Sequence, residues 1–171
     1  MKHTKNILKS LLITVMALSL LSVSCSKDEG GTKNPVNPDT PITIDAKTIN
    51  SVLTFNNLEV GEEKVTISTT SPDVSTSTKI TVSAKAAQGK NNIAKADFKT
   101  GIEQIISNLN ISGATVARNG EIDTSVSGKA PMSVKLDIAP SGQNKFDAAL
   151  TTVKDGKLSI TLEITPDKVW N

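Results

Sequence analysis

Residues 132–138 read Met-Ser-Val-Lys-Leu-Asp-Ile, and residues 158–164 read Leu-Ser-Ile-Thr-Leu-Glu-Ile. In both stretches an apolar residue stands at every second position, with a polar or charged residue between. Successive side chains of a strand point to opposite faces, so this alternation predicts two strands that are buried on one face only. Such strands are typical of antiparallel sheets. The last third of the chain therefore indicates a mostly β fold.

A third alternation lies between these two stretches, at Phe146, Ala148 and Leu150. We therefore expect three antiparallel strands in succession, with turns near Pro140-Ser141-Gly142 and Asp155-Gly156. A one-residue shift of register would turn a strand's apolar side chains to the opposite face. Burial then favours a three-residue loop over residues 154–156, with Gly156 in a bulge and Leu150 opposite Ile160.

Shorter alternations earlier in the chain predict further strands, at residues 42–44, 52–60, 65–67, 80–86 and 94–98. Asn119-Gly120 lies between residues 114–117 and 121–126 and is a strong hairpin signal. These patterns predict an antiparallel β-barrel or a β-sandwich, and they leave the choice between the two open.

One segment has the period of a helix. Its apolar residues are spaced at i, i+3, i+4 and i+7, and they are Ile102, Ile105, Ile106 and Leu109. Thr100 and Glu103 have the spacing of a capping box, and Gly113 follows as a stop. We expect one short α-helix near residues 101–110, packed against the sheet rather than lying on a membrane surface.

The N-terminus follows the plan of a secretory leader. Lys2, Lys5 and Lys9 precede an apolar run at residues 11–23, which is shorter than the ~20 residues that a membrane-spanning helix needs. The small residues 22–24 end this run just before a cleavage point. Residues 1–24 are therefore expected to be a signal peptide that is removed.

Cys25, the only cysteine of the chain, follows this cleavage point directly. Small residues that end in a single cysteine resemble the lipobox of bacterial lipoproteins, although Ser22 stands where that motif usually has Leu or Val. The resemblance implies that Cys25 is acylated and anchors the protein to the outer membrane. Several acyl chains would hold it far longer than one. The alternative is a plain secreted protein with a cysteine near the cut.

The residues after the cysteine are Ser26, Lys27, Asp28 and Glu29. This short tract of Lys or Ser with acidic residues is similar to the export signal of surface-exposed lipoproteins in Bacteroidota. The resemblance implies a cell-surface location, whereas an ordinary charged linker would leave the protein on the periplasmic face. Residues 25–41 would then be the lipidated cysteine and a flexible tether, in which residues 27–41, rich in Gly and Pro, span up to about 45 Å when extended. Residues 42–171 form a single expected domain.

Composition excludes several classes of function. Three of the 19 Lys and Arg residues precede Cys25 and all 17 acidic residues follow it, so the mature chain has 16 basic and 17 acidic residues and a net charge of −1. No basic field remains to attract nucleic acid. The only histidine, His3, lies in the leader, and the chain has no tyrosine. We therefore expect no enzyme, no metal site and no cofactor.

Two groups of carboxylates are candidate sites. Glu59, Glu62 and Glu63 surround a turn at Gly61, which breaks the ligand spacing of a calcium loop. Glu121 and Asp123 lie two apart and would share one face of a strand, as a glycosidase pair can. Both groups are expected to be solvated surface. Trp170 is expected to close the base of the sheet.

The segment from Ala130-Pro131-Met132 to Ile164 resembles the closing strands of calycin-like domains in small Bacteroidota lipoproteins. The shared features are a Pro-Met strand opening and a Gly-Lys-Leu strand start. The resemblance implies a non-enzymatic barrel that binds a small apolar ligand. The alternative is a structural or accessory subunit of a cell-surface protein assembly, which would act through strand edges. The sequence assigns no ligand-binding residue and no oligomeric state.

Overall fold

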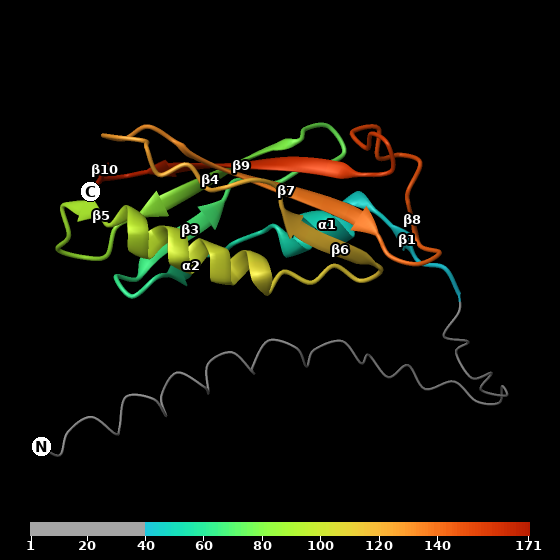
Figure 1. Ribbon diagram of the computed structural model, residues 1–171, viewed down its shortest axis with the longest axis horizontal. Coiled ribbons are helices and arrows are strands. Elements are labelled where there is room, and N and C mark those ends of the chain that lie inside the picture. Colours follow the sequence, from blue (N-terminus) through green and yellow to red (C-terminus); the bar gives the residue numbers. More distant parts are fainter. Residues whose placement is uncertain (1–39) are drawn as a thin grey trace, which may run out of the picture. The chain divides into compact units, whose positions relative to one another are not determined.

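The computed structural model describes residues 40–171, which belong to one compact unit. Cys25 and residues 26–29, with the predicted leader and most of the tether, lie outside the described residues. The fold is mostly β with two helices, and its main sheet is curled into a half-barrel (Figure 1). The predicted fold class is confirmed, with one helix more than the sequence indicated.

The main sheet has six strands. In spatial order they are β2 (Leu58–Val60), β3 (Val65–Thr69), β4 (Lys79–Lys85), β9 (Leu158–Pro166), β7 (Met132–Pro140) and β6 (Ala114–Arg118). Neighbours run antiparallel except β4 and β9, which run parallel. Two short parallel pairs flank the sheet: β1 (Thr43–Ile44) with β8 (Lys145–Phe146), and β5 (Asn92–Ile93) with β10 (Val169–Trp170). The helices are α1 (Ala46–Val52) and α2 (Lys95–Ser107).

The strands at 132–138 and 158–164 are confirmed, and they pair with each other as β7 and β9. Met132 lies opposite Ile164, and Leu136 lies opposite Ile160. The apolar side chains of both strands are buried on one face, as the alternation requires. These pairs bring the two strongest alternations of the chain side by side in the middle of the sheet.

The predicted strand at 146–150 and its register are wrong. Only residues 145–146 are in a strand, and they pair with β1. Asp147 then forms a turn, because its carboxylate accepts from Ala149 N at 2.9 Å and its carbonyl accepts from Leu150 N at 3.0 Å. The loop before β9 has two residues, since Lys154 and Lys157 exchange both main-chain hydrogen bonds at 2.9 Å around Asp155-Gly156.

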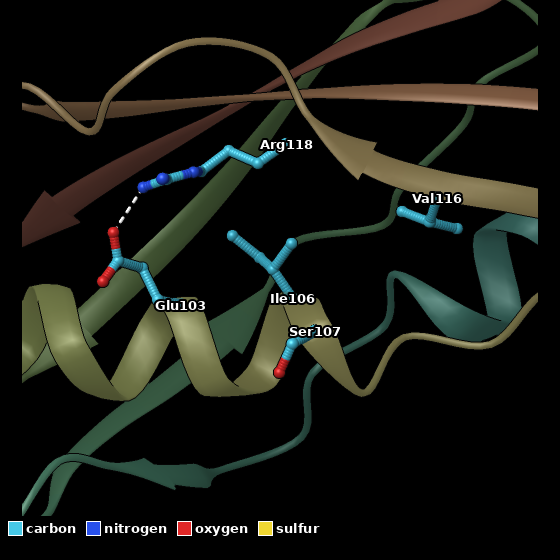
Figure 2. A pocket seen from close by; sticks show the side chains of 5 residues that line it. All are labelled: Glu103, Ile106, Ser107, Val116 and Arg118. Carbon is cyan, nitrogen blue, oxygen red and sulfur yellow. Dashed lines mark hydrogen bonds and ion pairs between the residues drawn. The ribbon is translucent and has the colours of Figure 1, made fainter.

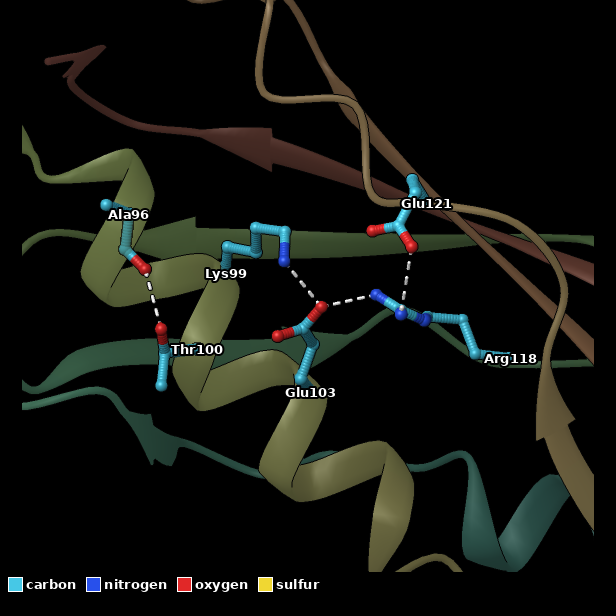
Figure 3. A network of polar contacts seen from close by, with 6 residues as sticks. All are labelled: Ala96, Lys99, Thr100, Glu103, Arg118 and Glu121. Atoms are coloured by element: carbon cyan, nitrogen blue, oxygen red, sulfur yellow. Dashed lines mark hydrogen bonds and ion pairs between the residues drawn. The ribbon is translucent and has the colours of Figure 1, made fainter.

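Helix α2 is longer than predicted and begins earlier. Residues 95–98 are its first turn, so the strand predicted at 94–98 is wrong. The capping box is wrong as well: Thr100 lies inside the helix and its hydroxyl donates to the carbonyl of Ala96 at 3.0 Å (Figure 3). Phe98 extends the apolar face of Ile102 and Ile106 by one turn, and this added burial favours the helix over an isolated strand.

Two other segments also differ from the alternation pattern. Residues 46–52 form helix α1, which overlaps the first residue of the strand predicted at 52–60. Asp45 caps this helix, because its carboxylate accepts from Thr48 N at 2.7 Å. Residues 121–126 form no strand, so Asn119-Gly120 does not join a hairpin. The reason is that β6 takes β7 as its partner, while Ile122 anchors the segment after it to the core.

Helix α2 packs on the inner face of the curled sheet and contacts both edge strands, β2 and β6 (Figure 1). Its buried residues join one apolar core with those of the strands. Trp170 closes one end of this core, as predicted: it is 6% exposed and its ring lies 5.2 Å from that of Phe98. The helix therefore stands where a closed barrel would have more strands.

Candidate functional site

A hollow of about 300 Å³ lies between α2 and the edge strand β6. Its walls are five side chains: Glu103, Ile106 and Ser107 from the helix, and Val116 and Arg118 from the strand (Figure 2). The helical residues lie three and four positions apart and the strand residues two apart, so each set shares one face of its element. Ile106 and Val116 supply the apolar part of the lining, and Glu103 and Arg118 the charged part.

The main chain of β6 adds hydrogen-bonding groups at this hollow. Asn119 N donates to Lys135 O at 2.8 Å, and Ser141 N donates to Gly113 O at 2.9 Å. In an antiparallel pair every second residue bonds to the partner strand, so the odd-numbered residues of β6 face β7. The N–H and C=O groups of Val116 and Arg118 therefore point away from β7. They lie at an edge that no other strand of the described chain occupies.

An ionic network crosses the hollow from helix to strand. Glu103 Oε1 binds both Lys99 Nζ, at 2.6 Å, and Arg118 Nη1 (Figure 3). Arg118 Nη2 also lies 3.5 Å from Glu121 Oε1. The hydrogen bond from Lys99, together with the charges of Lys99 and Arg118, lowers the pKa of Glu103 despite partial burial. Two cations and two carboxylates balance, so the network links α2 to β6 without a net charge.

The lining of the hollow holds one hydroxyl, that of Ser107, and one carboxylate, that of Glu103. The Ser107 hydroxyl donates to Gln104 O at 2.8 Å, and the Glu103 carboxylate accepts from Lys99 and Arg118. Within residues 40–171 no group of His, Cys, Asp or Glu side chains is arranged to hold a metal ion. An apolar floor beside free main-chain groups suits an extended chain or a small apolar molecule.

The carboxylates considered from the sequence do not meet in a site. Glu62 N and Glu63 N donate to the carboxylate of Asp97 at 2.9 and 3.0 Å, so α2 holds this turn through their main chain. Glu121 and Asp123 are not on a strand, and each has its own neighbour. Ser125 lowers the pKa of Asp123, first through a hydrogen bond of its side chain and then through its main-chain nitrogen, which donates to the Asp123 carboxylate at 2.8 Å.

A second polar cluster lies on the outer face of the sheet, around Asp137 of β7. Its carboxylate accepts from Ser159 Oγ at 2.7 Å, Lys157 Nζ at 3.0 Å and Asn119 Nδ2 at 3.1 Å. Ser159 is the main cause of a lowered pKa for Asp137, and Lys157 and Asn119 act in the same direction. This cluster ties the end of β6 to β7 and to the start of β9.

The sequence pattern placed Ile106 on the buried face of a helix and gave Glu103 a capping role. It did not indicate that both residues face strand β6. One signal was present: Arg118 is the only arginine of the chain. A planar, permanently charged side chain at the end of a strand suits pairing with a carboxylate. Nothing in the sequence indicated that this carboxylate is Glu103, because a local pattern does not show which strand the helix contacts.

Comparison with protein-family models, with curated proteins and with solved structures finds no match to this chain. Among the described residues no helix is long and apolar enough to cross a membrane.

Proposed function

We propose that this chain is a lipid-anchored, surface-exposed lipoprotein whose domain binds a partner without catalysis. The anchor is supported by the leader and by Cys25 at its cleavage point, and the surface location by the tract of residues 26–29. The binding role is supported by the free edge of β6 beside the α2–β6 hollow. We propose no catalysis, because the Ser107 hydroxyl already donates to Gln104 O and the Glu103 carboxylate is paired with Lys99 and Arg118.

The partner that this edge favours is an extended segment of another surface protein. Such a segment would add to β6 as a strand and bond to the outward groups of Val116 and Arg118, with one apolar side chain over Ile106. The edge is five residues long and spans only ~17 Å. A stable contact between two folded proteins buries ~1,200–2,000 Å². A short edge therefore suits a peptide segment better than a second folded copy. This is the accessory-subunit function.

A small apolar ligand is the second candidate, and the volume of the hollow favours it. About 300 Å³ is at the lower limit of known ligand pockets. Ile106 and Val116 would contact such a molecule, while the ion pair of Glu103 and Arg118 would cover it. This is the function that the calycin-like resemblance implies.

Val116→Pro separates the two candidates. Proline has no N–H, and at an edge position whose N–H faces outward it leaves the β6–β7 ladder intact. We expect the variant to lose cross-linking to a surface partner on intact cells, because an added strand needs that N–H. It should keep any copurifying apolar molecule, because the proline ring still lines the hollow.

Ala117→Val is the matched control, since Ala117 lies on the outer face of the same strand. It should behave as the wild type in both assays. Unchanged cross-linking in a folded Val116→Pro protein would contradict strand addition. Cys25→Ala tests the anchor separately, because it should move the protein from the membrane to the soluble fraction. A Cys25→Ala protein that stays on the membrane without detergent would contradict the lipoprotein reading.

A further inference from the structure

Asn119 has a chemical setting that no other asparagine of the chain shares. It is exposed at the end of β6 and is followed by Gly120, and the sequence contains no other Asn-Gly pair. Gly120 has a φ of +84°, and a Cβ added there would meet no atom within 4 Å. Gly120 is therefore exposed, and the space that a side chain would fill beside its main-chain nitrogen is open.

We propose that Asn119 is a site of spontaneous deamidation that alters the end of strand β6. The nitrogen of Gly120 attacks the side-chain carbonyl carbon of Asn119, loses its proton and closes a five-membered succinimide ring. The bond from that carbon to the amide nitrogen breaks, and ammonia leaves. Water then adds to either carbonyl of the ring, which opens to aspartate or to isoaspartate. No oxidant or reductant is needed, and water is the only co-reactant.

The product carboxylate would form beside a carboxylate that is already there. Asn119 Nδ2 now donates to Asp137 Oδ2 at 3.1 Å. After the reaction this donor is lost and a negative charge takes its place. Lys157 Nζ lies 3.0 Å from Asp137 Oδ2, and Lys135 is the residue opposite Asn119 in the ladder, so two cations adjoin the pair, while Ser159 remains a donor to Asp137. Like charges this close repel each other, so the cluster would hold β6 less firmly.

Isoaspartate would add a second disturbance. It inserts one methylene into the main chain next to the last ladder bond of β6, in which Asn119 N donates to Lys135 O. Arg118, which faces the α2–β6 hollow, immediately precedes this point. The deamidated fraction therefore grows with the age of the protein, and with it the fraction of molecules in which the end of β6 is altered. The reaction does not depend on what the hollow binds.

The reaction is tested on the full-length chain, purified in detergent and incubated at mildly alkaline pH. Mass spectrometry of proteolytic peptides follows each asparagine, and enzymatic methylation detects isoaspartate. The peptide with Asn119 should convert severalfold faster than the peptide with Asn108, which is also exposed but precedes leucine. Gly120→Ala should reduce the rate at Asn119 to that of Asn108. Equal rates at Asn119 and Asn108 in the wild type, or no slowing in Gly120→Ala, would overturn the proposal.

The effect on the strand is tested with fixed substitutions. Asn119→Asp should melt at a lower temperature than Asn119→Ser, because only the first places a charge beside Asp137. Adding Asp137→Asn should remove most of that difference, since the like-charge pair is then absent. Equal melting of Asn119→Asp and Asn119→Ser would show that the new charge does not weaken the sheet, and would overturn this part of the proposal.

Discussion

Gly101 of α2 lies directly against Gly61, at the turn between β2 and β3. A Cβ at position 101 would stand 2.6 Å from Val60 Cγ1 and would overlap the main chain of Gly61. A Cβ at position 61 would in turn overlap the carboxylate of Asp97, which holds the same turn. The pair of glycines therefore sets how closely the helix approaches the edge strand β2.

Gly101→Ala is expected to destabilise the domain although alanine is the better helix former. Alanine gains up to about 1 kcal/mol of helix propensity over glycine. Forcing a methyl group into a filled contact costs about 1–3 kcal/mol. The contact here is with main chain that cannot rotate away, so the loss should exceed the gain. Urea denaturation of the purified domain measures the difference.

Gln104→Ala is the control for this substitution, because Gln104 is exposed on the same helix. It should leave the free energy of unfolding within about 0.5 kcal/mol of the wild type. If Gly101→Ala raises stability by the amount that helix propensity predicts, the close approach of the two glycines is not a real constraint.

The Glu103 network predicts a dependence of stability on pH. The pKa of Glu103 is lowered, first by the hydrogen bond from Lys99. A carboxylate with a lowered pKa in the folded state stabilises the protein above its unfolded-state pKa, and this contribution is lost as the pH falls through the folded pKa. The free energy of unfolding of Glu103→Gln should therefore fall less than that of the wild type when the pH is lowered from neutral to acidic.

Glu121→Gln is the matched comparison, since Glu121 also pairs with Arg118 but is 81% exposed. In Glu121→Gln, stability should depend on pH in the acidic range nearly as it does in the wild type. Thermal denaturation across the acidic range measures both variants. Identical pH dependence in Glu103→Gln and the wild type would show that the network contributes nothing to folding.

The fold class was predictable because β7 and β9 carry alternations of seven residues. The pairing of strands was not, because a local pattern does not name its partner. Phe146 and Leu150 alternate correctly, yet Asp147 forms a turn between them. Asn119-Gly120 likewise has the composition of a hairpin, but β6 pairs with the distant β7. A local turn outweighed the alternation in the first case, and long-range pairing outweighed the hairpin signal in the second.

The hollow was less predictable than the fold. Its two walls come from residues 103–107 and 116–118. These segments are close in sequence but become neighbours only when α2 packs on the inner face of the curled sheet. Periodicity gives the face of a helix, not which strand it meets. The free edge of β6 could not be anticipated either, since the sequence pattern assigned that strand a different partner.

Substitution of the tract after the cysteine tests the proposed surface location. Replacing Lys27, Asp28 and Glu29 by alanine should leave the lipid anchor in place, because Cys25 is unchanged. Protease added to intact cells should then no longer cleave the domain, whereas it should cleave the wild type. A control that replaces Asn34 and Asn37 of the tether should stay accessible. Undiminished cleavage of the alanine variant would contradict an export role for the tract.

Trp170 joins three parts of the domain at its C-terminal end. Its indole packs against Phe98 and its Nε1 donates to Ala130 O at 2.8 Å, while its main-chain nitrogen donates to Gly128 O at 2.8 Å. Truncation of a buried tryptophan to alanine costs about 3–5 kcal/mol, because packing is lost and a cavity remains. Trp170→Ala should therefore lower the free energy of unfolding by an amount in that range.

Trp170→Phe should cost much less, since a ring stays against Phe98 and only the hydrogen bond to Ala130 is lost, worth about 1 kcal/mol. Val169→Ala is the control, because Val169 is the neighbouring residue and is 45% exposed. It should change stability by no more than about 0.5 kcal/mol. Urea titration followed by circular dichroism measures all three variants, since Trp170 is the only tryptophan and fluorescence would be lost with it. A Trp170→Ala protein as stable as Val169→Ala would mean that the core does not depend on this end of the sheet.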